Sequence, residues 1–397
     1  MMRVGVVTTS YPREAGDPAG HFVAGFVHWL AGQGAAVEVV AAGPGAAVVE
    51  GIRVERVAGH GLFYEGGAPD ALTQPGAWRR AGGFVAALAA VVARRIGAWE
   101  AAVSHWVAPC GLVTAAILAA RWSDQGSDRR SDRSSEKSPR RPHLAIAHSS
   151  DVTLLRRSRP GRLALRALAT RADLVYAAPH LVVPGAPGRV VPMGIDKAGL
   201  QGDRARGRQA LGLQGKTVLF LGRLVPVKGV DLLLEALAPG AGGPAIELLV
   251  AGDGPLYGEL RARAQALGVT ARFLGEVRGQ AKADLLAAAD VLVVPSRRLG
   301  DGRSEGTPTV LFEALAAGVP VVATRDAGVR HVLVDGQEGL IVPPEPAALR
   351  LAIGRLLGDP ALCKSLAQAG RHISAACDWS QVGPVLARDL LTRRLRR

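Results

Sequence analysis

The stretch EGTPTVLFEALAAGVPVVAT, residues 305–324, predicts a loop, a helix and a buried strand in close succession. Thr307 is suited to cap this helix, and Pro308 fits its first position, where no backbone N–H is needed. Apolar side chains recur at helical spacing at Val310, Leu311, Ala314 and Leu315. A short strand that is apolar throughout belongs in a sheet buried on both faces, so the stretch indicates an α/β domain.

Two carboxylates lie at this helix start. Glu305 precedes the N-terminus, where unpaired N–H groups and the positive end of the helix dipole favour an anion such as phosphate. Glu313 lies roughly 8–9 Å beyond the cap at 1.5 Å per residue. That span approximates the separation of the diphosphate from the ribose hydroxyls of one nucleotide, so the pair suits a nucleotide-sugar donor. Two solvated carboxylates on an amphipathic helix are the simpler alternative.

Length and composition bound the class of protein. The chain has 397 residues, 48% of them hydrophobic and 21% charged, which predicts a globular protein of two domains. Cys110, Cys363 and Cys377 have neither metal-ligand nor disulfide spacing. The N-terminal MRVGVVTTS lacks the features of a signal peptide, so we expect a cytoplasmic protein.

The first half of the chain opens with a βαβ pattern. A strand at 4–9, a helix containing Phe22 and Phe26, and a strand at 37–41 predict a parallel sheet covered by helices. Strands at 52–57, 101–107 and 143–147 and an alanine-rich helix at 83–96 continue the pattern. Residues 122–142 are polar and charged, and we expect them to form a mobile insertion in this domain.

The second half is more regular. Six apolar strand candidates alternate with helices, which predicts a second Rossmann-like domain; they are TVLFLG, IELLVAG, RFLG, DVLVVPS, PVVAT and GLIV. Glycine- and arginine-rich residues at 196–216 mark the domain boundary. After the first of these strands, Gly222, Arg223 and Lys228 in LGRLVPVKGVD stand where α/β sheets bind ligands, and two cations there suit a diphosphate. An ordinary surface loop is the alternative.

The spacing of Glu305 and Glu313, together with the Gly222-Arg223 and Lys228-Gly229 pairs, resembles the retaining glycosyltransferases of family 4. The resemblance implies the GT-B fold: two Rossmann-like α/β domains facing each other across a cleft. It implies an acceptor-binding domain at 1–198, a nucleotide-sugar-binding domain at 199–375, and a C-terminal helix at 376–397 that returns to the first domain. It also implies that Arg223 and Lys228 bind the diphosphate, that Glu305 faces the donor sugar, and that Glu313 holds the ribose.

Further residues are assigned to donor binding by the same resemblance. The AGDGPL segment fails the dinucleotide fingerprint and is similar to a family segment that lines the donor cleft. The donor-binding residues implied are Gly20, Gly222, Gly252, Gly254, Val277, Gly306, Thr307 and Pro308, besides the charged ones above. For the glycines, tight backbone geometry is an alternative.

A histidine in the first domain completes the candidate catalytic set of Glu305, His148, Arg223 and Lys228. His148 heads HSSD after a predicted strand, where relatives have a histidine near the donor sugar; Ser149 replaces their glycine. Asp151 either acts beside it or caps the following helix. His105 in SHWVAPCG resembles a family segment at the acceptor cleft, and packing is its simpler interpretation.

The reaction that the resemblance implies needs no metal cofactor. The sequence contains no Asp-x-Asp, the motif that holds the metal in glycosyltransferases of the GT-A fold. Arg223, Lys228 and the helix start would then stabilise the leaving diphosphate. Transfer with retention of anomeric configuration is implied by the family alone.

The net charge of +14 indicates acidic partners. No nucleic-acid-binding motif accompanies it, so nucleotide sugars and a glycan or lipid-linked acceptor are the expected partners. The terminal TRRLRR allows peripheral contact with an anionic membrane at its inner face, or is simply solvated.

The sequence therefore predicts a retaining, metal-independent hexosyltransferase in bacterial surface polysaccharide, lipopolysaccharide or glycolipid synthesis. A nucleotide-sugar 2-epimerase of the GT-B fold, which needs no acceptor, and a non-catalytic nucleotide-binding homologue remain the alternatives.

Overall fold

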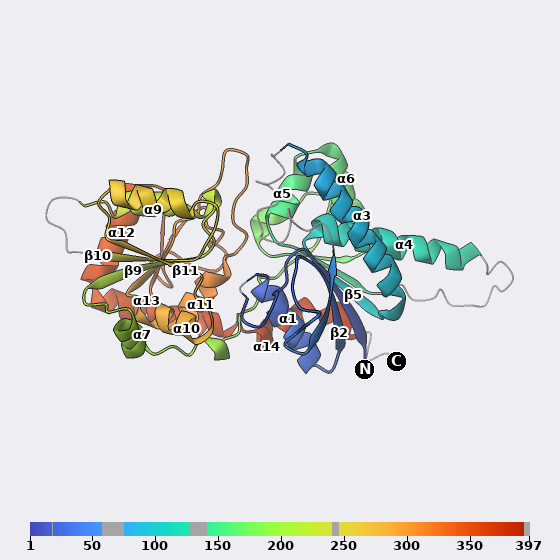
Figure 1. Ribbon diagram of the computed structural model, residues 1–397, viewed down its shortest axis with the longest axis horizontal. Helices are drawn as coiled ribbons and strands as arrows, with labels where there is room; N and C mark the ends of the chain where they lie inside the picture. The colour runs from blue at the N-terminus through green and yellow to red at the C-terminus, as the bar shows by residue number, and fades with distance from the viewer. Residues whose placement is uncertain (18, 58–74, 128–140, 240–245, 393–397) are drawn as a thin grey trace. The chain divides into compact units, whose positions relative to one another are not determined.

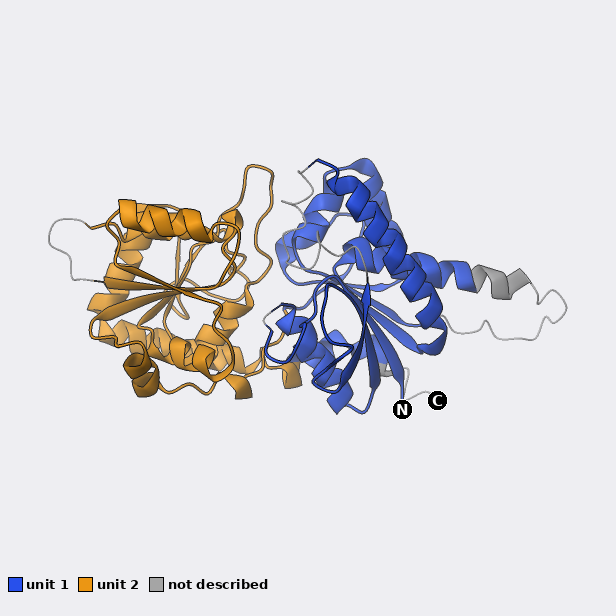
Figure 2. Ribbon diagram, in the orientation of Figure 1, with its two compact units in different colours: residues 1–192, 382–397 blue, residues 193–381 orange. Residues whose placement is uncertain are grey.

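The computed structural model describes residues 1–17, 19–57, 75–127, 141–239 and 246–392 (Figure 1). The chain divides into two compact units, coloured separately in Figure 2. Unit 1 comprises Met1–Pro192 and Val382–Arg397, and unit 2 comprises Met193–Gln381. Each unit is built on its own sheet, and the two are described in turn.

The described residues of unit 1 form an eight-stranded sheet in the order β3-β4-β2-β1-β5-β6-β7-β8. All neighbouring strands are parallel except β3 and β4. The strands are β1 (Arg3–Thr8), β2 (Ala36–Ala42), β3 (Val48–Val49), β4 (Ile52–Val57), β5 (Ala101–His105), β6 (His143–Ala147), β7 (Asp173–Tyr176) and β8 (Arg189–Val190).

The helices of unit 1 connect these strands. They are α1 (His21–Gly32), α3 (Ala77–Arg95), α4 (Leu112–Ser127), α5 (Ser150–Arg156), α6 (Arg159–Ala169) and α15 (Arg388–Thr392), with α14 (Trp379–Leu386) crossing the unit boundary. Short helical turns are η1 (Ile96–Ala98), η2 (Val107–Gly111) and η3 (Pro179–Leu181).

In unit 2 the described residues form a six-stranded parallel sheet in the order β11-β10-β9-β12-β13-β14. Its strands are β9 (Lys216–Leu221), β10 (Ile246–Ala251), β11 (Ala271–Gly275), β12 (Val291–Val294), β13 (Val321–Thr324) and β14 (Leu340–Val342). Its helices and turns are η4 (Ala198–Leu200), α7 (Arg204–Ala210), η5 (Pro226–Lys228), α8 (Val230–Ala236), α9 (Tyr257–Ala266), α10 (Gly279–Ala288), α11 (Thr309–Ala317), α12 (Pro346–Gly358) and α13 (Pro360–Ala375).

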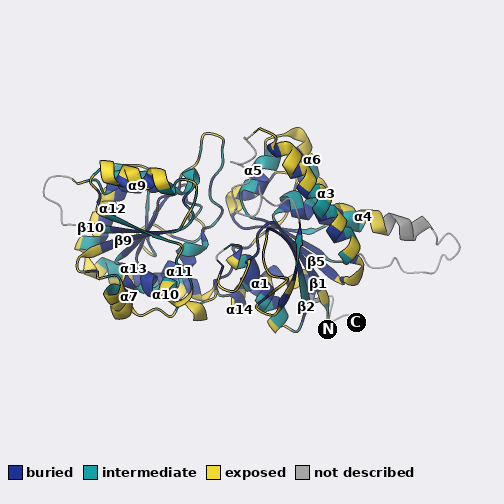
Figure 3. Cartoon of the chain, viewed as in Figure 1, coloured by how far each residue is buried: buried dark blue, intermediate teal, exposed yellow. Residues whose placement is uncertain are grey.

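Helices cover both faces of the unit 2 sheet, and each face carries its own apolar cluster. Successive side chains of a strand point to opposite faces, so Val218 and Phe220 of β9 belong to one cluster and Leu219 to the other. The central strands β12 and β13 are buried at every position, and β9 and β10 are buried over most of their length, while many residues on the outer sides of the helices are exposed (Figure 3). This explains why the strands are apolar at nearly every position, and it confirms the predicted α/β class with two Rossmann-like domains.

The units meet at 192/193 and at 381/382, whereas the predicted domain boundaries were 198/199 and 375/376. The glycine- and arginine-rich stretch 196–216, in which we expected the domain boundary, contains helix α7, which is fastened to α10. Arg206 donates two hydrogen bonds of 2.6 Å to Asp284, and the backbone of Gly207 lies directly against the Asp284 carbonyl. Polar contacts rather than an apolar stripe hold this helix, so its sequence shows little periodicity.

The predicted insertion at 122–142 falls partly outside the described residues. Helix α4 continues to Ser127, so the insertion does not begin at residue 122 as expected. Residues 128–140 and the terminal residues 393–397, which include most of the basic tail, lie outside the described part.

Helix α3 and turn η1, Ala77–Ala98, are long and apolar enough by composition to cross a membrane, the one such stretch in the described residues. One face of this helix, with Phe84, Leu88 and Val92, is buried in an apolar cluster that includes Val40 and Ala102 of the sheet. A core helix of an α/β domain is equally long and apolar, so this composition is only weak evidence for a membrane span.

We predict that Leu219→Ala lowers the free energy of unfolding by about 2–5 kcal/mol, because Leu219 is fully buried in the centre of β9 and its removal leaves a cavity. The matched control is Leu351→Ala on α12, where the side chain is 76% exposed and the change should stay within about 0.5 kcal/mol. Urea unfolding midpoints measure both. Equal losses would contradict the assignment of this core.

Candidate functional site

The candidate donor-binding residues of unit 2 follow the carboxyl ends of its strands. Gly222 follows β9, Gly252 follows β10, and Val277 comes two residues after β11. Because all strands of this sheet are parallel, these ends lie on one edge, where α/β sheets bind their ligands. The loop before α11, with Glu305, reaches the same region through its contact with Lys228.

Lys228 and Glu305 form an ion pair, with the Lys228 Nζ 3.0 Å from the Glu305 Oε1. Both side chains are largely buried, with 19% and 12% of their surface exposed. A carboxylate and an ammonium that are shielded from water attract each other more strongly than an exposed pair does. The structure therefore brings together two of the four candidate catalytic residues.

The loop that carries Lys228 is held by Arg297, which the sequence did not single out. The Arg297 backbone N–H donates to the Val227 carbonyl at 2.9 Å, and its Nε donates to the Pro226 carbonyl at 3.2 Å. Its Nη1 lies 2.7 Å from Asp231 on α8. These contacts fix turn η5, and with it the position from which Lys228 extends.

Helix α11 begins at Thr309 with Pro308 at the N-cap, so Thr307 is not the cap that the sequence predicted. The Thr307 hydroxyl instead lies 3.0 Å from the Nε2 of His331, a second residue that sequence reasoning missed. Pro308 has no side-chain acceptor to offer the first N–H groups of the helix. The helix start thus lacks a side-chain cap and keeps the character of an anion site.

Glu313 lies in the second turn of α11, with only 6% of its side chain exposed. Its Oε1 accepts a hydrogen bond from the Lys282 Nζ at 2.8 Å. Lys282 lies on α10. In the sequence it is an ordinary lysine of a predicted helix, so its pairing with Glu313 could not be predicted. The ion pair compensates the charge of a carboxylate that is otherwise nearly buried.

Three of the candidate glycines have a backbone conformation that favours glycine, and two of them also lack space for a side chain. Gly222, Gly252 and Gly254 have φ values of 156°, 138° and 157°. A Cβ on Gly252 would lie deep inside the contact distance of the Gly222 carbonyl, and one on Gly254 would lie 2.5 Å from the Leu224 carbonyl oxygen. The backbones of the two loops therefore approach each other directly, which supports the alternative that we stated for them.

Two other candidates have partners within unit 2. Val277 packs against the apolar cluster that contains Leu219, so its side chain serves the core at least in part. Gly306 is buried, and its carbonyl lies against Gly328, whose φ is 71°. These contacts position the Glu305 loop over the start of α11.

Gly20 and His148 belong to unit 1. Gly20 is the N-cap of α1 with φ 65°, and a Cβ there would lie 2.4 Å from the Ser10 carbonyl oxygen, so backbone geometry alone requires a glycine. His148 follows β6 and is half-buried among aromatic rings, Phe22 at 5.0 Å and Trp106 at 4.7 Å between centroids. Loss of solvent lowers the pKa of His148 well below the ordinary value, so the ring is neutral near pH 7.

Asp151 fastens the loop of His148. Its buried carboxylate accepts the backbone N–H of Ser149 at 2.9 Å, of His148 at 3.2 Å and of Val107 at 2.8 Å. Asp151 thus joins the loop after β6 to the loop after β5, a role beyond the helix capping that its sequence suggested.

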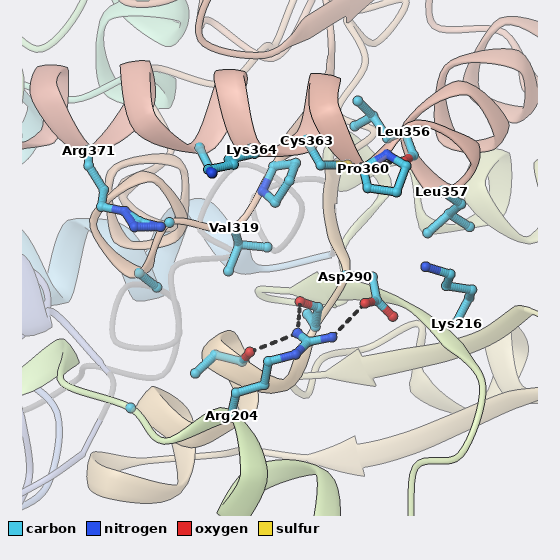
Figure 4. A pocket seen from close by; sticks show the side chains of 17 residues that line it. Arg204, Lys216, Asp290, Val319, Leu356, Leu357, Pro360, Cys363, Lys364 and Arg371 are labelled. Atoms are coloured by element: carbon cyan, nitrogen blue, oxygen red, sulfur yellow. Dashed lines mark hydrogen bonds and ion pairs between the residues drawn. The ribbon is translucent and has the colours of Figure 1, made fainter.

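A pocket of about 510 Å³ lies at the opposite edge of the unit 2 sheet, near the amino ends of β9 and β12 (Figure 4). Lys216 begins β9, and Asp290 precedes β12. Arg204 donates to Asp290 at 2.6 Å and to the Ala289 carbonyl at 2.9 Å, so this arginine fastens α7 to the end of α10. None of the residues predicted to act on the donor lines this pocket.

Within the described ranges, no group of three histidine, cysteine, aspartate or glutamate side chains is arranged to hold a metal ion. The candidate site of unit 2 instead consists of two lysine–glutamate pairs, Arg223 and a helix start.

Comparison with known proteins assigns this part of the chain. Residues 203–373 match the family of glycosyl transferases group 1. A GDP-mannose-dependent alpha-(1-6)-phosphatidylinositol monomannoside mannosyltransferase of Mycolicibacterium smegmatis is 36% identical over 252 residues, which are 59% of this chain and 66% of that protein. A phosphatidyl-myo-inositol mannosyltransferase of Mycobacterium leprae is 42% identical over 178 residues, 44% of this chain and 46% of that protein. The match thus spans less than two thirds of these relatives.

Solved structures are similar over the whole chain. Sucrose-phosphate synthase of Thermosynechococcus elongatus has a TM-score of 0.73 at 21% identity and covers 100% of this chain and 99% of its own. The Anabaena protein HepE, in complex with UDP and glucose, has a TM-score of 0.70 at 19% identity and covers 99% and 100%. At such identities the likeness shows the fold, and that fold is GT-B.

The fold defines the class of α/β protein as GT-B. Within unit 2, residues 203–373 belong to the group 1 glycosyltransferases.

We predict that Gly252→Ala destabilises unit 2 by about 1–3 kcal/mol or more, because alanine has neither the φ nor the space that this position needs. Gly258→Ala on α9 is the control, since nothing lies within 4 Å of its added Cβ and alanine favours a helix. Urea unfolding followed by circular dichroism measures both variants. If Gly252→Ala did not change the free energy of unfolding, packing would not explain the glycine, and contact with a ligand would be the remaining explanation.

Proposed function

We propose that this protein is a retaining glycosyltransferase that moves a hexose from a nucleotide-diphosphate sugar to the hydroxyl of a glycolipid acceptor. The observation that carries the proposal is the Lys228–Glu305 ion pair beside an uncapped helix start, in a domain of the group 1 family. GDP-mannose and a phosphatidylinositol lipid are the first substrates to test, because the names of the relatives specify them.

Different residues of unit 2 bind different parts of the donor. Arg223, Lys228 and the first N–H groups of α11 stabilise the diphosphate, because positive charge and helix dipole are preorganised there. Glu305 addresses the sugar. Glu313, held by Lys282, accepts hydrogen bonds from the ribose hydroxyls, one helical turn from the start of α11.

Transfer then follows from the loss of the diphosphate. The bond between the anomeric carbon and the phosphate oxygen breaks, and the electron pair leaves with the nucleoside diphosphate. The acceptor hydroxyl adds to the anomeric carbon from the face that the diphosphate leaves, and its proton passes to a phosphate oxygen of the leaving group. The chain's own cations supply the charge stabilisation, so we propose that the reaction is metal-independent.

The glycolipid acceptor brings the protein to a membrane surface. We propose a cytoplasmic protein that contacts the membrane peripherally, and the net charge of +14 supports attraction to anionic lipid.

We predict that Glu305→Gln reduces kcat for mannose transfer by about a hundredfold or more, because it removes a charge aimed at the reacting sugar. Transfer from radiolabelled GDP-mannose to phosphatidylinositol vesicles measures it, with UDP-glucose as a second donor. The control is Glu259→Gln, an exposed carboxylate on α9, which should transfer at the parent rate. Full activity of Glu305→Gln would disprove the assignment, and donor turnover without any acceptor product would disprove the transferase.

We predict that Glu313→Gln raises the KM for the donor about tenfold or more with little change in kcat. The charged hydrogen bond to the ribose stabilises the bound donor equally in the ground state and in the transition state, so its loss weakens binding but does not slow the chemical step. The same variant should need more GDP to raise the melting temperature. A fall in kcat at unchanged KM would place Glu313 at the reacting sugar instead.

We predict that the protein sediments with vesicles containing phosphatidylglycerol at low salt and is released by about 0.5 M salt, since exposed charges are screened at that ionic strength. Vesicles of phosphatidylcholine alone are the control. Binding to neither kind of vesicle would contradict the peripheral contact.

A further inference from the structure

Four rings meet beyond the carboxyl ends of β5 and β6 in unit 1. They belong to Phe22 on α1, to His105 and Trp106 at the end of β5, and to His148 after β6. The His105 and His148 rings are nearly parallel, with centroids 5.2 Å apart and planes at 13°. Trp106 has φ 65°, a conformation that costs a bulky residue about 1–3 kcal/mol and is enriched at functional sites.

The two histidines are hydrogen-bonded to each other. The Nδ1 of His105 lies 3.1 Å from the Nε2 of His148, and Asp151 fastens both loops that carry them. His105 is fully buried, whereas His148 keeps contact with solvent. Burial lowers the pKa of both rings, that of His105 further through the neighbouring His148, so both are neutral near pH 7. One proton therefore lies on the line between the two nitrogens.

The surroundings of His105 decide which ring holds that proton. The Nε2 of His105 is buried and has no hydrogen-bond partner in the described part of the chain. If His148 donated, His105 would have to carry its own proton on Nε2, as a buried N–H without an acceptor. The Phe26 ring, with its centroid 5.7 Å away, offers at most a weak contact. An orphaned buried N–H is rarer and more costly than an unfilled lone pair.

We propose that His105 is a positioning residue that donates its Nδ1 proton to His148 and thereby fixes His148 in the tautomer protonated on Nδ1. His148 then presents a neutral hydrogen-bond donor, not a base, to a hydroxyl or oxygen of the sugar substrates. This role rests on the proposed transferase function, because the His148 N–H needs a sugar oxygen as its acceptor. The tautomer itself follows from the geometry of unit 1 alone.

The direct test is ¹⁵N NMR of the full chain labelled at histidine, with the His148 signals identified through the variant His148→Gln. We expect a protonated Nδ1 and an unprotonated Nε2 on His148 between pH 6 and 8. A protonated Nε2 overturns the proposal. The measurement uses the unmodified protein and no substrate, so its outcome does not depend on whether the transferase assignment holds.

Two substitutions of His105 then separate the hydrogen bond from the packing. His105→Asn keeps an N–H donor near the Nδ1 position, whereas His105→Phe keeps a ring of similar size without a donor. We expect His105→Phe to shift His148 to the other tautomer and to lower kcat about tenfold, with the KM of the donor nearly unchanged, and His105→Asn to retain most of the activity.

His180→Gln, an exposed histidine of the same unit, is the control and should change neither the tautomer nor kcat. Equal losses in the Asn and Phe variants overturn the hydrogen-bond role, and an unchanged His148 tautomer in His105→Phe overturns the positioning. Absence of transfer by the parent protein, with the tautomer as expected, would count against the transferase proposal only.

Discussion

The common direction of the strands is the constraint on which the candidate site of unit 2 depends. Because the sheet is parallel, the carboxyl ends of β9, β10 and β12 share one edge, and their loops meet there. The glycine at position 252 then allows the loop after β10 to touch the backbone of Gly222 after β9. Side-chain chemistry is added to a surface that backbone geometry has already shaped, which is why Lys228 and Glu305 meet although 77 positions separate them in the chain.

Charge compensation is the second theme of the site. Each of the two glutamates in or before α11 is matched with a lysine from a different element, Glu305 with Lys228 and Glu313 with Lys282. Neither carboxylate would tolerate such limited contact with water alone. The pairs therefore orient both carboxylates, in positions that turn η5, which Arg297 holds, and helix α10 determine.

Much of the fold was predictable because the strands of unit 2 are apolar at almost every position, and all six candidates are strands. The helix α7 was not, since arginine–aspartate contacts rather than an apolar face hold it against α10. At the site, Glu305 and Lys228 were recognisable from local pattern. Lys282 was not assigned a role, and the contact of His105 with His148 was not predicted, because their partners lie 31 and 43 residues away in the chain and only the folded structure brings them together. The glycines show a further limit, because a sequence cannot tell close backbone packing from ligand contact.

The two ends of unit 2 are joined to each other. The Ile195 N–H donates to the Cys377 carbonyl at 2.9 Å, and the Trp379 N–H donates to the Ile195 carbonyl at 3.1 Å, while Trp379 packs against Gly194. Unit 2 is thus a continuous insert in the chain of unit 1, closed by its own hydrogen bonds where it enters and leaves. Domains inserted in this way are tolerated because both connections lie close together, so the sequence of unit 2 can change in evolution while the strands of unit 1 keep their order.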